Sequence, residues 1–128
     1  MNKFFLNLGR QPLANKYLSK FNTKQKKYNL KLNFNTETKL VSISKRISSA
    51  EMFDDKYPYR SSMSKTMRNA FNKLSKEIKK KFNPHLLLEI GSNDGALIKN
   101  FSKKKTVGIE PCLNLAQITR KLGYRTYS

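Results

Sequence analysis

The residues best suited to chemistry lie in two short stretches, a turn bounded by Gly91 and Gly95 and a single carboxylate at Glu110. Glu89 precedes the first glycine by two residues. Glycines at these positions allow a tight turn and a close approach of the backbone to a ligand. Short polar side chains that tolerate turn geometry lie between them: Ser92, Asn93 and Asp94. A carboxylate such as Glu110 can accept hydrogen bonds from ribose hydroxyls.

The elements that would position these residues can be predicted from hydrophobic periodicity. Residues 86–90 form an apolar run between Pro84 and Gly91, which favours a short strand buried on both faces of a parallel sheet. The apolar residues of 96–101 recur at helical spacing. Residues 107–109 predict a second strand, with Glu110 at its carboxyl end, where open α/β sheets bind ligands. Together these segments predict the opening β-α-β unit of a nucleotide-cofactor fold.

The turn differs from the dinucleotide fingerprint G-x-G-x-x-G, because it has two glycines and an acid between them. Asp94 would repel a pyrophosphate, which disfavours NAD and FAD. A cationic or zwitterionic ligand suits this aspartate better. A buried strand followed by an ordinary polar turn is the alternative without a ligand.

The pattern E-x-G-x-x-x-G at residues 89–95 resembles the first motif of class I S-adenosylmethionine-dependent methyltransferases. Glu110 resembles the ribose-binding acid of these enzymes. The resemblance implies S-adenosylmethionine as the cofactor. The cofactor-binding residues that it implies are Glu89, Gly91, Ser92, Asn93, Asp94, Gly95, Glu110 and Pro111.

Two upstream segments, residues 7–15 and 57–68, resemble the signature segments of the sugar C-methyltransferase family. With the glycine turn, three blocks match in the family's order and span nearly all of the chain. The resemblance implies a small zinc-binding N-terminal domain followed by a methyltransferase core. It also implies methyl transfer to a carbon of a nucleotide-linked keto-deoxysugar.

Residues 57–62 are implied by the same resemblance to lie over the cofactor and sugar pocket. The candidate substrate-binding residues are Tyr57, Tyr59, Ser61 and Ser62. The alternative is aromatic packing of a linker against the core, with Ser64 as the N-cap of the next helix. The sequence leaves both interpretations open.

The chain departs from the family in two respects. Family members hold zinc with two Cys-x-x-Cys pairs, whereas residues 35–38 read Asn-Thr-Glu-Thr and the single cysteine is Cys112, so we expect no zinc. The family's general base, typically a histidine, is expected downstream of Ser128, and His85 precedes the first strand of the core. We therefore expect this 128-residue chain alone to be inactive.

The predicted organisation has three parts. Residues 1–47 form a remnant of the small β-rich zinc-type module, with strand periodicity at 28–34 and 39–44. Residues 48–83 form a linker and an amphipathic helix over 64–82. Residues 84–128 begin a cofactor-binding methyltransferase domain. The expected fold class is α/β, a partial Rossmann-like class I methyltransferase.

Charge supports a second hypothesis. The chain has 27 basic and 8 acidic residues, a net charge of +19, which is typical of a nucleic-acid-binding protein. The lysines are scattered and accompanied by many asparagines, so base composition of the gene is the competing explanation. Apolar runs are too short to span a membrane, and a cytoplasmic enzyme is expected. Cys112 is predicted near a helix start, where a lowered thiol pKa competes with simple packing.

Overall fold

The computed structural model describes residues 1–18, 20–21 and 24–128, and these divide into two compact units, Met1–Met52 and Phe53–Ser128. The boundary lies inside the segment predicted as a linker. The architecture is mixed α/β, with one antiparallel and one parallel sheet of three strands each. Within the described ranges, no helix is both long and apolar enough to cross a membrane.

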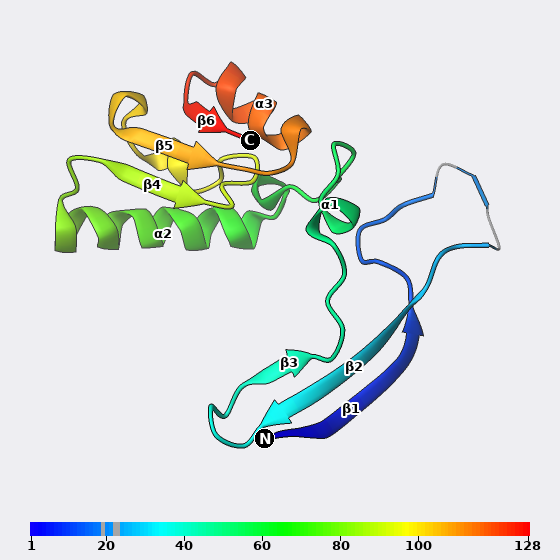
Figure 1. The fold of residues 1–128 in the computed structure, drawn as a ribbon. Helices are drawn as coiled ribbons and strands as arrows, with labels where there is room; N and C mark the ends of the chain where they lie inside the picture. Colours follow the sequence, from blue (N-terminus) through cyan, green and yellow to red (C-terminus); the bar gives the residue numbers. More distant parts are fainter. Residues whose placement is uncertain (19, 22–23) are drawn as a thin grey trace. The chain divides into compact units, whose positions relative to one another are not determined.

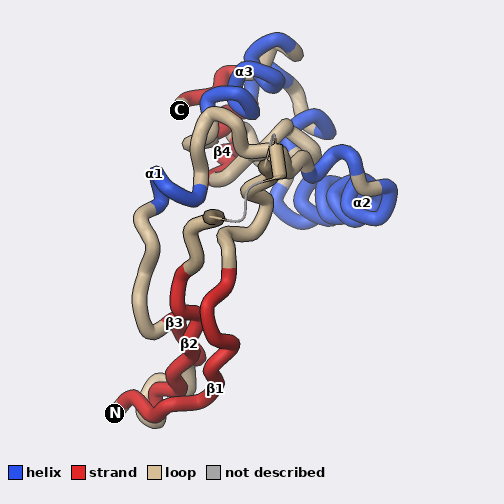
Figure 2. The backbone as a smooth tube through the Cα atoms, turned by 90° about the vertical axis from the view of Figure 1, so that its right-hand side faces the viewer, coloured by secondary structure: helices blue, strands red, loops and turns tan. Residues whose placement is uncertain are grey.

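The first unit is built on an antiparallel ladder of β1 (Asn2–Gln11), β2 (Tyr28–Asn35) and β3 (Val41–Ile43). Figure 2 shows the three strands side by side. The two predicted strand segments correspond to β2 and β3. β1 was not predicted as a strand, and its second half overlaps the segment 7–15. A short helix, α1 (Ser49–Met52), ends the unit, and the N–H of Glu51 donates to the carbonyl of Ser48.

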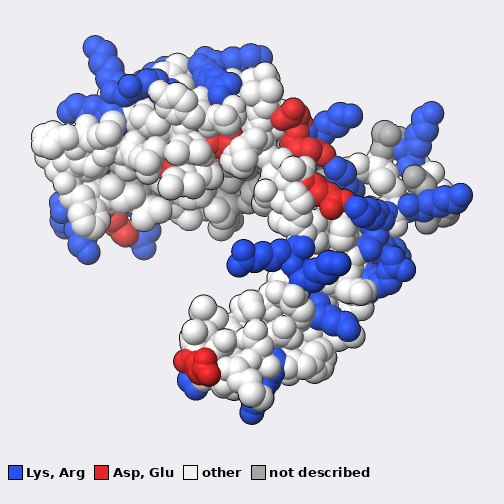
Figure 3. All heavy atoms as spheres, viewed as in Figure 1, with Lys and Arg blue, Asp and Glu red and all other residues white. Residues whose placement is uncertain are grey.

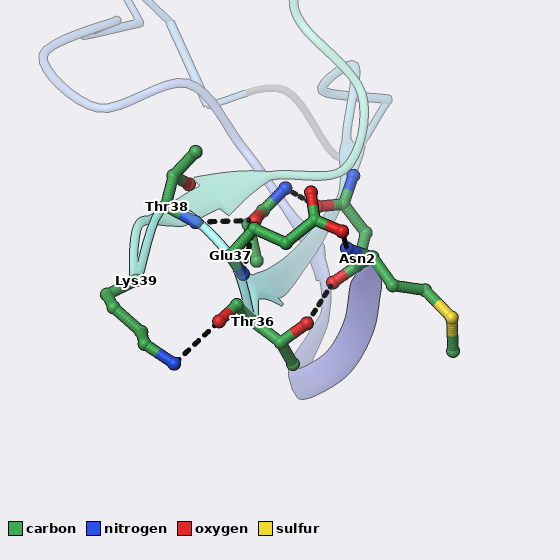
Figure 4. Close-up of polar contacts among 7 residues, drawn as sticks. Asn2, Thr36, Glu37, Thr38 and Lys39 are labelled. Atoms are coloured by element: carbon green, nitrogen blue, oxygen red, sulfur yellow. Dashed lines mark hydrogen bonds and ion pairs between the residues drawn. The ribbon is translucent and has the colours of Figure 1, made fainter.

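Polar contacts surround the turn between β2 and β3 (Figure 4). The side-chain oxygen of Asn35 accepts hydrogen bonds from the N–H groups of Glu37 and Thr38, each at 2.9 Å. The carbonyl of Met1 accepts from the N–H of Thr36, and the Met1 amino group lies 3.0 Å from the Glu37 carboxylate. Hydrogen bonds of polar side chains therefore hold this turn.

The second unit contains the parallel sheet, whose strands are β4 (Leu87–Ile90), β5 (Thr106–Ile109) and β6 (Arg125–Tyr127) in that order. The helix α3 (Leu113–Lys121) connects β5 to β6 and lies beside β6 (Figure 1). β4 and β5 fall where the sequence predicts strands, and all three strands pair in the parallel sense expected of a β-α-β unit.

The long amphipathic helix α2 (Lys65–Phe82) also confirms the prediction. Ser64 is its N-cap, since the hydroxyl accepts a hydrogen bond from the N–H of Met67 at 3.3 Å. Asn83 ends the helix in the left-handed conformation. Lys79 donates to the carbonyl of Asn100 at 2.6 Å, which joins α2 to the connection between β4 and β5.

Two details of the predicted β-α-β unit differ. Residues 96–101 contain a single 3-10 turn, η2 (Ile98–Asn100), and not a helix. The reason is local, because the side-chain amide of Asn100 donates to the carbonyls of Ala96 and Leu97, and further helical hydrogen bonds give way to these. β4 is also not buried on both faces, since Leu88 and Ile90 are 54% and 78% exposed.

A further 3-10 turn, η3 (Lys103–Lys105), consists of three consecutive lysines. A third, η1 (Ser61–Met63), precedes α2. The apolar core lies in the second unit, on the side of the sheet that faces α3 and η2. Its members are Ala96, Ile98, Cys112, Leu115, Ala116 and Tyr124.

Candidate functional site

The candidate site lies at the carboxyl ends of β4 and β5, which adjoin because the two strands are parallel neighbours. The turn that follows β4 is joined to the last residue of β5. The N–H groups of Gly91 and Ser92 both donate to the carbonyl of Ile109, at 2.8 and 3.0 Å. Glu110 is held from the other side, since its N–H donates to the carbonyl of Tyr127 at 2.8 Å.

Glu110 lies against the turn, as we expect if the turn and this carboxylate belong to one site. One carboxylate oxygen accepts a hydrogen bond from the N–H of Asn93 at 2.7 Å, and the other accepts from the N–H of Cys112 at 2.9 Å. The side chain is 4% exposed. The carboxylate therefore connects the turn to the start of α3, a role that the sequence analysis did not predict. Pro111 is exposed between them.

The turn uses the left-handed conformation three times, at Gly91 (φ 75°), Asn93 (φ 50°) and Gly95 (φ 80°). Glycine and asparagine are the residues that adopt this region at lowest cost. At Gly95 space is also restricted, because an added Cβ would lie 2.8 Å from the Thr119 methyl and 3.3 Å from Ile98. This glycine permits the close contact between the turn and α3.

The segment before α2 contacts the turn directly, so that two blocks more than thirty residues apart in sequence meet. The Asn93 side-chain oxygen accepts from the N–H of Ser61 at 2.9 Å, and its amide donates to the carbonyl of Tyr59 at 3.2 Å. The Asp94 carboxylate accepts from the N–H of Ser62 at 3.1 Å and from the Ser62 hydroxyl. Ser61 and Asp94 are both buried.

The two tyrosines of this segment differ in environment. The Tyr57 ring meets the Phe53 ring edge to face at 5.4 Å, and its carbonyl accepts from the side-chain amide of Asn114 at 2.9 Å. Tyr59 is 44% exposed. The ring of Tyr57 therefore has an aromatic partner within its own segment, whereas the ring of Tyr59 is exposed.

Glu89 lies on β4 in the same cross-strand row as Gly108 of β5 and Thr126 of β6. Burial raises the pKa of its carboxyl to about 7, the nearby charge of Glu110 adds to this, and a hydrogen bond from the backbone of Ile98 opposes it. One of its oxygens is buried without a hydrogen-bond partner. A carboxyl with this pKa is mostly protonated below neutral pH and about half ionised at pH 7.

Two further polar side chains, one in the turn and one near it, have a buried oxygen without a hydrogen-bond partner. The hydroxyl of Ser92 is buried and unpartnered, and an added Cβ at Gly108 would lie 2.7 Å from it. The side-chain oxygen of Asn114 is likewise buried and unpartnered. Spacing had indicated Ser92 as a turn residue, but the burial of its hydroxyl and of the Asn114 oxygen depends on tertiary structure.

Cys112 is the N-cap residue of α3 and is 1% exposed. Burial raises the pKa of its thiol to about 11, and the neighbouring carboxylate of Glu110 acts in the same direction. The packing interpretation of this cysteine therefore holds, since a thiol with a raised pKa is a poor nucleophile. His85 is exposed before β4, outside the turn. In the described ranges, no three His, Cys, Asp or Glu side chains form a group that could hold a metal ion.

Comparison of the sequence with protein families and with curated proteins gave no match.

Proposed function

We propose that this chain is an S-adenosylmethionine-dependent C-methyltransferase of the type that acts on nucleotide-linked keto-deoxysugars, with a Rossmann-like cofactor domain beginning at β4. One observation carries the proposal. The Glu110 carboxylate after β5 accepts a hydrogen bond from the N–H of Asn93 in the turn after β4, so the two stretches chosen from sequence are in contact. The carboxyl ends of parallel strands are where α/β folds bind ligands.

In this proposal the 91–95 turn holds the methionine and ribose side of the cofactor, and Glu110 holds the ribose. Each carboxylate oxygen of Glu110 accepts one backbone N–H, and each has a second lone pair for a ribose hydroxyl. Because Glu110 is 4% exposed, residues around it have to move when the ligand enters. We therefore expect weak binding, since ordering and opening the site reduce the net affinity.

The cofactor, when bound, supplies an electrophilic sulfonium methyl group. Transfer to a carbon beside a keto group also requires a base within hydrogen-bond reach of the proton that is removed. Among the described residues, the 91–95 turn and its neighbours include no histidine, Asp94 and Glu110 are already engaged by N–H groups, and Glu89 lies within β4 and not in the turn. We therefore propose that the 128-residue chain binds the cofactor without turning over substrate.

Calorimetry with S-adenosylhomocysteine tests the assignment. Glu110→Gln keeps the shape of the side chain but removes the charge that would hold the ribose, and we expect about a tenfold loss of affinity. The matched control is Glu77→Gln on α2, which removes an equal charge from an exposed position. Circular dichroism of each variant checks the fold. If Glu110→Gln and the additional variant Gly91→Val both leave the measured affinity unchanged, the assignment of the site is wrong.

A further inference from the structure

Basic side chains gather at one end of the antiparallel sheet because of its topology. β1 ends, β2 begins and β3 ends at this end, since neighbouring strands run in opposite directions. Each of these three strand ends has basic residues beside it: Arg10, Lys26, Lys27, Lys45 and Arg46. The ladder therefore converts scattered positions in the sequence into one cluster, which we call the basic end.

The basic end lines a cavity of 590 Å³. Its described lining includes one acidic residue, Glu51, and this carboxylate is already paired with Lys26 and with the Tyr28 hydroxyl. The hydrogen bond between Lys26 and Glu51 lowers the pKa of the Glu51 carboxyl and raises the pKa of the Lys26 ammonium. Four further basic residues then remain in the lining with no acidic residue to balance them: Arg10, Lys27, Lys45 and Arg46.

An apolar cavity of 340 Å³ adjoins the basic end and shares part of its lining, notably Lys45, Arg46 and Ile47. The rest of its wall is mostly apolar and includes Leu13, Leu30, Ile43 and Met52. The Tyr28 ring is covered by Lys26, whose ammonium lies 5.1 Å from the ring centre. Tyr28 also lines the apolar cavity, so a planar group that enters the cavity can contact this ring.

Figure 3 shows that basic side chains are unevenly distributed on the surface of this unit. They appear in blue near the end of β1 and the start of β2. The opposite end, at the turn between β2 and β3, shows fewer basic side chains on the same face, together with an acidic group. Met1–Met52 contains eleven lysines and arginines and two acidic residues. The charge is concentrated around a cavity as well as being high in total.

We propose that the basic end binds a nucleoside phosphate, with its phosphates on Arg10, Lys27, Lys45 and Arg46 and its base in the adjoining apolar cavity. Cations bind phosphate oxygens, and an apolar cavity accepts the flat face of a base. A free nucleotide and a single-stranded nucleic acid both present this chemistry. The proposal does not rest on the cofactor site, which lies in the other unit.

Calorimetry of the full chain with three probes tests the proposal: uridine diphosphate, inorganic pyrophosphate and a short uridine oligonucleotide. Uridine diphosphate should bind about tenfold more tightly than pyrophosphate, because only the nucleotide brings a base to the apolar cavity. Tighter binding of the oligonucleotide than of uridine diphosphate would identify a nucleic-acid strand as the source of the phosphates, and the reverse would identify a free nucleotide. Equal affinity for uridine diphosphate and pyrophosphate, or no saturable binding of uridine diphosphate at low salt, would overturn the proposal.

Variants separate a site from diffuse charge. Lys45→Ala with Arg46→Ala should weaken uridine diphosphate binding about tenfold or more, because two phosphate contacts are lost. Lys80→Ala with Lys104→Ala removes the same charge from exposed positions in the other unit and should change the affinity less than about twofold. Ile47→Asn should weaken uridine diphosphate binding while pyrophosphate binding is retained, which also reports that the unit is folded. Equal losses in the two double variants would contradict the proposal.

Discussion

At the scale of single residues, the candidate site is held by polar side chains that bond to backbone groups of other segments. Asn93 is the clearest case, since its side chain reaches the N–H of Ser61 and the carbonyl of Tyr59 while its own N–H donates to Glu110. Residue types and spacing predicted that the turn and Glu110 share a site. They did not predict that the turn also holds the segment before α2, because that contact depends on tertiary structure.

Glu89 gives a prediction about pH. Its pKa is raised to about 7 in the folded chain, so the folded state binds a proton more tightly than the unfolded state does. The contribution of this group to stability is therefore greatest at low pH and is lost as pH rises from about 4.5 to about 7. Since the carboxyl is partly open to solvent, we expect a loss of about 2 kcal/mol or less.

The variant Glu89→Gln, which resembles the protonated acid, should remove this pH dependence. Urea unfolding of both proteins across this pH range measures the difference. The two unfolding free energies should agree at the acidic end and separate toward pH 8 in favour of the glutamine variant. A constant difference at all pH values would show that Glu89 titrates normally.

At the scale of elements, we expect alanine substitutions at Gly91 and Gly95 to reduce stability by different amounts. Gly95→Ala would place a methyl group 2.8 Å from Thr119, whose hydroxyl is fixed by hydrogen bonds to Ala116 and Thr126. We expect a loss of about 2–4 kcal/mol, because overpacking adds to the cost of a positive φ. At Gly91 the φ is similar but no atom lies within 4 Å of the added group, so Gly91→Ala should cost about 1 kcal/mol.

Chemical denaturation of these two single variants provides the comparison, and each serves as the control for the other. A larger loss at Gly91 than at Gly95 would mean that the turn does not pack on α3 as described.

The elements with strong local signals were predicted correctly. β4 and β5 follow from short apolar runs next to glycine or proline, and α2 follows from helical periodicity between Ser64 and Asn83. β1 was missed because every one of its residues is exposed, so burial imposes no alternation on its sequence. The predicted helix at 96–101 failed because the Asn100 side chain competes for backbone carbonyls.

At the scale of the whole molecule, burial is concentrated in the second unit. In the part of the chain that the structure describes, the buried hydrophobic side chains all lie within residues 96–124. Among the described residues of Met1–Met52, none is buried, and the sheet there exposes Phe4, Leu8 and Ile43. The two units should therefore differ in stability, since apolar burial is the main contribution to folding.

Amide hydrogen exchange of the intact chain measures this difference. Amides of β5, which lies between two strands and includes the buried Thr106 and Gly108, should exchange slowest. Amides of β1 and β2 should exchange faster by about a hundredfold or more, because a unit without a buried core opens at low cost. Equal protection in β1 and β5 would indicate one cooperative structure.

The central claim is that the turn after β4 and the acid after β5 bind S-adenosylmethionine or its product. Titration of isotopically labelled protein with S-adenosylhomocysteine, followed through backbone amide resonances, tests it most directly because weak binding is still detected. We predict that the resonances of residues 91–95 and of Glu110 shift in a saturable way, while those of β1 and of the exposed face of α2 stay in place. No saturable shift in residues 91–95, or shifts confined to the basic end, would contradict the claim.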